Sequence, residues 1–210
     1  MNPQIWWYLA RATGIVAWVL LVASVVWGVL LATRVLKPVD RPAWLLVMHR
    51  WLSALAVTCT GLHLAALAAD GYVHFGWMEL FVPGASPWRT TAVAIGVVAF
   101  WLLMIVHVSS LLMRRLPRAI WRRVHYVSYA TVWLVSVHAG MAGTDVTNRV
   151  YQFVALLLTI AAVSAALVRV LSPGRAGGAA SREGRPRRPA PAERQEATAD
   201  GATADGVTVS

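Results

Sequence analysis

The feature that most constrains this chain is an apolar stretch, residues 43–70, that is long enough to cross a bilayer yet contains two histidines. It reads AWLLVMHRWLSALAVTCTGLHLAALAAD, and the histidines are His49 and His63. A helix of about 20 apolar residues spans the hydrocarbon core of a membrane. An imidazole in that setting needs a polar partner and usually serves a function. The stretch therefore predicts a membrane helix that presents two ligands.

A second stretch, residues 119–140, has the same character. It reads AIWRRVHYVSYATVWLVSVHAG and contains His125 and His138. The two histidines are 14 residues apart in the first stretch and 13 apart in the second. At about 1.5 Å per residue, both intervals are roughly 20 Å along a helix. Each stretch thus places one histidine towards each membrane face, which predicts two stacked ligand sites between two helices.

The composition places the whole chain in the membrane class. It is 58% hydrophobic and only 13% charged, which is too apolar for an ordinary soluble domain. Backbone groups in lipid must pair within their own segment, so the spans are expected to be helices. The predicted fold is an all-α integral membrane protein, a five-helix transmembrane bundle. Its expected spans are Ile5–Leu36, Ala43–Ala69, Trp88–Met113, Ala119–Met141 and Arg149–Leu171.

Basic residues indicate the topology. Arginine and lysine gather in the loop after the first span, in the loop after the third span and in the tail. The positive-inside rule then puts the N-terminus outside and the C-terminus in the cytoplasm. Residues 1–171 form the expected transmembrane domain, and residues 172–210 a disordered, basic, Ala- and Pro-rich tail. The net charge of +10 predicts contact with membrane lipid, not nucleic acid, in a multi-pass protein of the plasma membrane.

The topology also decides which histidines meet. The second and fourth spans run in the same direction, so His49 and His125 are expected at one depth near the inner face, and His63 and His138 at one depth near the outer face. Two such pairs can each hold one planar haem by both axial positions of its iron. Zinc would instead draw its ligands together at one point. The single cysteine, Cys59, excludes a cysteine-based iron–sulfur or zinc site.

Helical rotation agrees with one pair and leaves a question for the other. Fourteen steps of about 100° return to within about 40° of the start, so His49 and His63 share a face. Thirteen steps leave His125 and His138 well apart on a regular helix. The sequence therefore predicts either a local irregularity in the fourth span or haems that approach it from different flanks.

The spacing H-x13-H followed by H-x12-H, with MHRWLSALAVTCTGLHL and WRRVHYVSY around the histidines, resembles the ferric reductase-like transmembrane family. That family includes ferric reductases, NADPH oxidases and the haem-binding membrane subunit of a periplasmic methionine sulfoxide reductase system. The resemblance implies two bis-histidine b-type haems ligated by His49, His63, His125 and His138. The chain departs from the family in having five expected spans where six are common, and in lacking a flavin and nicotinamide domain. A membrane subunit served by partners is therefore expected.

Several other polar residues are candidates near these sites. Arg50, Arg122 and Arg123 either pair with propionates of the inner haem or act only as topology charges. His107 either hydrogen-bonds a propionate or quinone, substitutes as a haem ligand, or packs between helices. His74 lies in the outer loop, either simply exposed or at an acceptor surface.

The expected function is transmembrane electron transfer through two haems, as a component of an oxidoreductase. The donor would be a quinol or a flavoprotein, and the acceptor would lie outside the cell. One alternative is a quinone-reactive cytochrome b subunit that anchors a dehydrogenase. Others are a non-catalytic haem-binding membrane protein, and a protein without haem whose histidines only pack helices.

Overall fold

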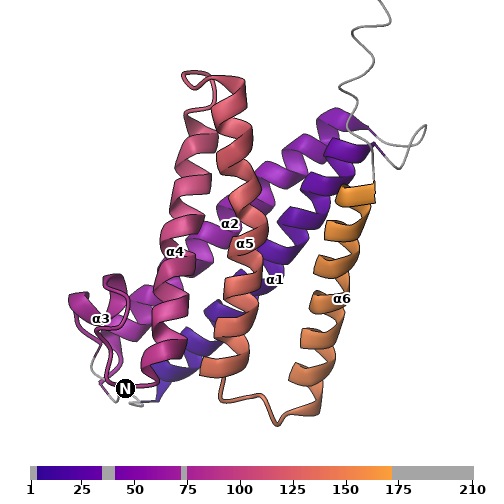
Figure 1. Cartoon of the computed structure of the whole chain (residues 1–210). Helices are drawn as coiled ribbons and strands as arrows, with labels where there is room; N and C mark the ends of the chain where they lie inside the picture. The colour runs from indigo at the N-terminus through magenta and orange to yellow at the C-terminus, as the bar shows by residue number, and fades with distance from the viewer. Residues whose placement is uncertain (1–3, 35–40, 72–74, 172–210) are drawn as a thin grey trace, which may run out of the picture. The chain divides into compact units, whose positions relative to one another are not determined.

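A computed structural model describes residues 4–34, 41–71 and 75–171 of the chain, and Figure 1 shows their arrangement. All regular secondary structure in these residues is helical, and they contain no strand. The predicted all-α architecture is confirmed for this part of the chain. The tail that the sequence predicts to be disordered lies outside the described residues.

The described residues form five long helices and one short helix. They are α1 Ile5–Thr33, α2 Pro42–Ala69, α3 Trp77–Phe81, α4 Thr90–Leu111, α5 Arg118–Ala142 and α6 Arg149–Leu171. The long helices match the expected spans within a few residues, apart from the predicted end of the first span at Leu36, which lies outside the described residues. The short helix α3 was not predicted.

The helix ends follow from local chemistry. Pro42 opens α2, where its fixed φ suits a helix and its missing N–H is not needed. Pro117 immediately precedes α5. Arg34 ends α1 in a left-handed conformation with φ 56°, and its N–H donates to the carbonyl of Leu30 at 3.0 Å. This closes the last turn of the helix.

Among the described residues, four helices are long and apolar enough to cross a membrane: α1, α2, α4 and α6. Large apolar side chains cover their outer surfaces, such as Val150 (72% exposed) and Leu111 (70% exposed). Because water does not favour such surfaces, they are suited to lipid contact. The fifth long helix, α5, is not among the four; it carries Arg118, Arg122 and Arg123 in its first two turns. The described helices thus indicate a membrane protein.

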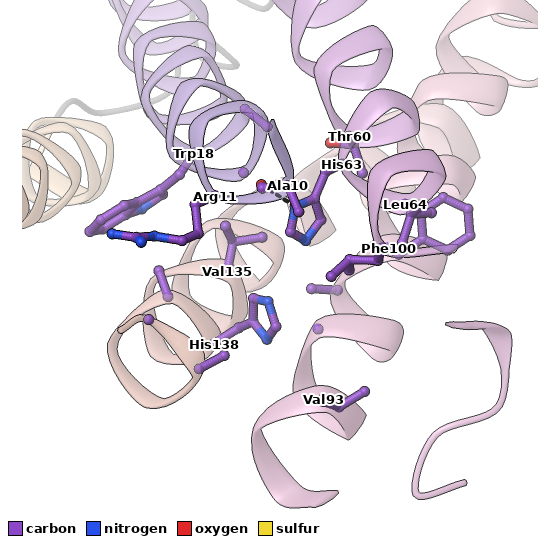
Figure 2. A pocket seen from close by; sticks show the side chains of 18 of the residues that line it. Ala10, Arg11, Trp18, Thr60, His63, Leu64, Val93, Phe100, Val135 and His138 are labelled. Atoms are coloured by element: carbon purple, nitrogen blue, oxygen red, sulfur yellow. Dashed lines mark hydrogen bonds between the residues drawn. The ribbon is translucent and has the colours of Figure 1, made fainter. Parts of the chain in front are cut away.

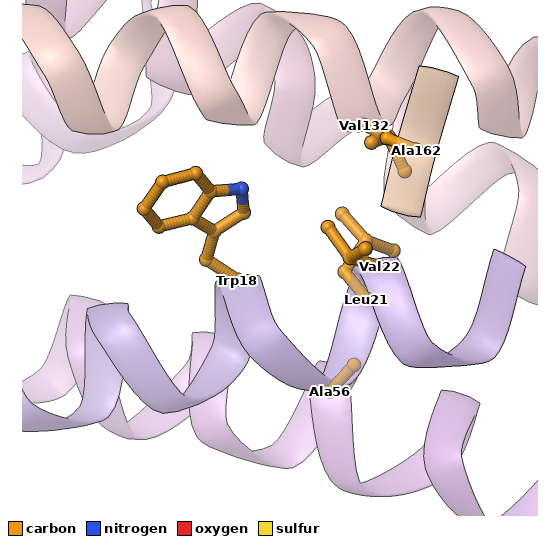
Figure 3. Close-up of a cluster of buried hydrophobic side chains, with 6 residues drawn as sticks. All are labelled: Trp18, Leu21, Val22, Ala56, Val132 and Ala162. Carbon is orange, nitrogen blue, oxygen red and sulfur yellow. The ribbon is translucent and has the colours of Figure 1, made fainter. Parts of the chain in front are cut away.

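The helices pack as two antiparallel pairs, α1 with α2 and α4 with α5, and α1 also contacts α5 and α6. Figure 1 shows α2 and α5 running in the same direction, as the pairing of their histidines requires. A buried cluster joins the pairs, with residues from α1, α2, α5 and α6 (Figure 3): Trp18, Leu21, Val22, Ala56, Val132 and Ala162. The indole N–H of Trp18 donates to the hydroxyl of Ser136 at 3.0 Å, which ties α1 to α5.

Candidate functional site

The structure brings His49 of α2 and His125 of α5 side by side. Their ring centres are 6.0 Å apart and their planes are inclined by 73°. An imidazole nitrogen lies about 2 Å from a metal ion that it ligates, and its ring centre about 1 Å farther back, so two axial imidazoles on one ion have ring centres about 6 Å apart. The pair is therefore spaced as two axial ligands of one metal ion would be.

The other two histidines meet at a cavity of about 200 Å³. His63 of α2 and His138 of α5 both line it, and Figure 2 shows their rings turned towards the same space. Most of its wall is apolar, including Leu64, Val93 and Phe100. The cavity also has polar lining residues, among them Thr60 and Tyr151. It suits a large apolar ligand that offers a metal ion to the two imidazoles.

Three of the four histidines donate a hydrogen bond from Nδ1 to a backbone carbonyl of a neighbouring helix. His63 donates to Ala10 at 2.7 Å. The other two bonds are His49 to Ser24 at 2.9 Å and His138 to Ala92 at 2.8 Å. A carbonyl only accepts, so Nδ1 carries the hydrogen and the lone pair of the neutral ring is on Nε2. Each ring is thus oriented as metal-ligating histidines usually are.

His125 has a different partner. Its Nδ1 lies 3.4 Å from the hydroxyl oxygen of Ser110 on α4. That hydroxyl already donates to the carbonyl of Val106 at 2.8 Å, so it accepts from the histidine. The tautomer is the same as in the other three rings, but the bond is longer.

Hydroxyl groups also surround His49. Its Nδ1 lies 3.3 Å from the hydroxyl of Ser24, which lies 2.8 Å from the hydroxyl of Ser53. Ser53 donates back to the carbonyl of His49 at 2.8 Å. The His49–His125 level therefore has hydroxyl groups beside both rings, although His49 also donates to a carbonyl, as His63 and His138 do.

An unpaired donor lies next to the His49–His125 pair. The indole of Trp121 stacks on His125, with ring centres 5.1 Å apart and planes inclined by 25°. Its N–H is buried and has no hydrogen-bond partner in the described part of the chain, and the same holds for Trp27. Buried N–H groups are nearly always paired. An acceptor carried by a cofactor, such as a haem carboxylate, would satisfy the Trp121 donor, so the residues fit haem at this level.

Charged side chains also lie at the level of His63 and His138, and none of them was among the predicted site residues. Arg11 lines the cavity and pairs with Asp145, with its Nε 2.9 Å from one carboxylate oxygen. Glu79 of α3 also lines the cavity. Arg11 lies one residue after the carbonyl that accepts from His63, a position that sequence alone does not mark.

The predicted arginines are not drawn to the histidines. Arg50, Arg122 and Arg123 are exposed, and none of them forms a hydrogen bond or ion pair within the described part of the chain. All three side chains lie at the surface of their helices, and their predicted pairing with haem propionates stays a prediction. His107 is half-buried on α4, and His74 lies outside the described residues.

Two further observations bear on the geometry. Helix α5 is unbroken from Arg118 to Ala142, which favours departure of His125 and His138 from different flanks over a local irregularity. Within residues 4–34, 41–71 and 75–171, no three His, Cys, Asp or Glu side chains converge as at a zinc centre. The histidines meet in twos.

Comparisons with known proteins give no match: no protein-family model, curated protein or solved structure matches the chain.

Proposed function

We propose that this chain is a membrane cytochrome b that carries electrons across the bilayer through two haems, each held by two histidines. The observation that carries the proposal is the double pairing: His49 with His125, and His63 with His138, between two co-directional helices. The levels are separated by 14 residues of α2, or about 21 Å at 1.5 Å per residue.

The chain's own residues have defined roles in this proposal. The four imidazoles would hold the iron through Nε2, since Nδ1 is engaged by a carbonyl or a hydroxyl. Those bonds fix the ring orientation and raise the basicity of the ligand. Apolar side chains such as Leu64 and Phe100 would surround the haem held by His63 and His138 and keep water from it. When bound, haem supplies a reversible one-electron iron couple, whose potential the protein tunes through these contacts.

The membrane arrangement is part of the same proposal. The helix α5 crosses the bilayer as a fifth span, with its three N-terminal arginines reaching the headgroups by their long side chains. The basic loop before α5 lies in the cytoplasm, so the N-terminus is outside and residues 172–210 form a cytoplasmic tail. The membrane is the plasma membrane. Electrons come from a quinol or flavoprotein and leave to an external acceptor.

This function agrees with the resemblance to the ferric reductase-like family, in the form of a subunit served by separate partners. The test is haem content and redox difference spectra of the purified full chain in nanodiscs. Two low-spin haems per chain, both reducible by dithionite, are expected. A chain that is folded but contains no b-type haem after expression with ample haem would reject the proposal.

A further inference from the structure

Each histidine of α2 packs against a glycine of α1. A β-carbon placed on Gly14 would lie 3.0 Å from Nδ1 of His63, and one placed on Gly28 would lie 3.2 Å from Cε1 of His49. Real β-carbons rarely approach ring atoms so closely, so a side chain at either position would press on the imidazole.

The histidines of α5 meet α4 at the corresponding positions. A β-carbon on Gly96 would lie 2.6 Å from Nδ1 of His138. Fourteen residues later along α4, the equivalent position is Ser110, which faces His125 through its hydroxyl. We call the residue of α1 or α4 that packs against each imidazole its seat. Three seats are therefore glycine, and the fourth is serine.

The glycines occur in a fixed register with the carbonyl acceptors. Each lies four residues after the residue that accepts from the histidine: Ala10 and Gly14, Ser24 and Gly28, Ala92 and Gly96. In a helix the carbonyl of one residue points along the axis towards the residue four positions later. A β-carbon at that later position partly covers the oxygen. Glycine leaves it open, so an imidazole can reach its second lone pair.

The same register explains the serine. Ser110 lies four residues after Val106, and its hydroxyl donates to the Val106 carbonyl. The Ser110 hydroxyl thus binds the carbonyl that an imidazole binds at the other seats. It accepts a hydrogen bond from His125 in turn. The two seats of α1 are 14 residues apart, as are the two seats of α4 and the two histidines of α2.

We propose that α1 and α4 are templates that set the tautomer and orientation of the four ligands. Gly14, Gly28, Gly96 and Ser110 are positioning residues in this scheme: they expose or relay a backbone acceptor to Nδ1 and thereby direct Nε2 to the iron. The inference rests on the proposed function, because it concerns how the haem ligands of that function are held.

The first experiment places a methyl group in a seat. Gly96→Ala should weaken retention of the His63–His138 haem by about 10- to 100-fold, the usual effect of losing a partner behind a metal ligand. Gly14→Ala should act on the same haem more mildly, because its contact is less close. Haem stoichiometry and the low-spin electron paramagnetic resonance signals of full-length protein in nanodiscs report the loss.

Two other glycines provide matched controls. Gly61 lies two residues before His63 and Gly140 two residues after His138, and a β-carbon on either meets nothing within 4 Å. Alanine favours a helix more than glycine does, so all four variants share that gain. Gly61→Ala and Gly140→Ala should retain both haems with wild-type signals.

The second experiment uses the serine seat and does not depend on tolerance of a clash. Ser110→Ala removes the partner of His125 and leaves a β-carbon over the Val106 carbonyl, so the signal of the His49–His125 haem should change. Ser110→Gly opens that carbonyl and recreates the form of the other seats, so it should keep the haem. If residue 110 mattered only as a small packing residue, alanine would be at least as good as glycine.

The outcomes separate the two proposals. A folded wild type without haem rejects the proposed function. A different result rejects only the inference that α1 and α4 orient the ligands, and leaves the proposed function standing. That result is a wild type with two haems together with an unchanged Gly96→Ala, or with a Ser110→Ala that matches Ser110→Gly. Should Gly96→Ala fail to fold, the comparison at Ser110 decides.

Discussion

Removing haem from the cavity between His63 and His138 should destabilise the protein by an amount that follows from its volume. The cavity measures about 200 Å³, and unfilled apolar space in a protein costs about 24 cal/mol per Å³. The product, about 5 kcal/mol, is an upper value because the cavity is partly open to its surroundings and its walls relax partly into the space. Haem-depleted protein should therefore unfold more easily than loaded protein.

The assay compares full-length protein from haem-replete and haem-limited cells. Unfolding in increasing sodium dodecyl sulfate is followed by tryptophan fluorescence, since the chain has 11 tryptophans. The depleted sample should lose about 2–5 kcal/mol of unfolding free energy. Equal stability of the two samples would refute the idea that this cavity seats the ligand.

A cavity-filling variant sharpens this test. Ala99 of α4 is buried and lines the cavity. Ala99→Leu adds three carbons, which should stabilise the depleted protein by about 2 kcal/mol at about 0.8 kcal/mol per buried group. The same change should exclude the haem between His63 and His138 and leave the haem between His49 and His125 bound. Ala94 of α4 does not line the cavity, so Ala94→Leu should bind both haems.

Three other predictions concern single contacts and the topology. Trp18→Phe removes the bond that joins α1 to α5 and should cost about 1 kcal/mol in the same unfolding assay, whereas the exposed Trp133→Phe should cost little; equal costs would contradict the role of the bond. Trp121→Phe keeps the stacking on His125 but removes the unpaired N–H. It should therefore shift the midpoint potential of the His49–His125 haem only. An unchanged potential would show that the indole donates to nothing there. Cysteines introduced at 112–117 should be labelled only from the cytoplasm, and labelling from outside would reverse the orientation.

The sequence predicted the helices and the histidine pairs because both depend on spacing. Apolar length defines a span, and two intervals of similar length on co-directional helices bring their histidines to matched depths. The rings of His49 and His125 do lie together. The short helix Trp77–Phe81 was missed because one turn of apolar residues in a loop carries no periodic signal. It is held by contacts that only the fold supplies, such as the bond from the indole of Trp101 to the carbonyl of Phe81.

The partners of the histidines were missed for a different reason. The carbonyl groups of Ala10 and Ala92 accept the bonds, and every residue has a carbonyl, so residue identity does not mark them. A signal was nevertheless present: Gly14 and Gly28 repeat at the 14-residue interval of the histidines of α2. The arginines near the histidines are exposed, and their pairing with haem propionates stays a prediction.

The most direct test of the account is the loss of haem from four single variants of the full chain, measured by redox difference spectra and haem quantitation. His49→Ala and His125→Ala should lose one and the same haem, and His63→Ala and His138→Ala should lose the other. Retention of both haems in all four variants, or loss of one haem shared by His49→Ala and His63→Ala, would contradict the account.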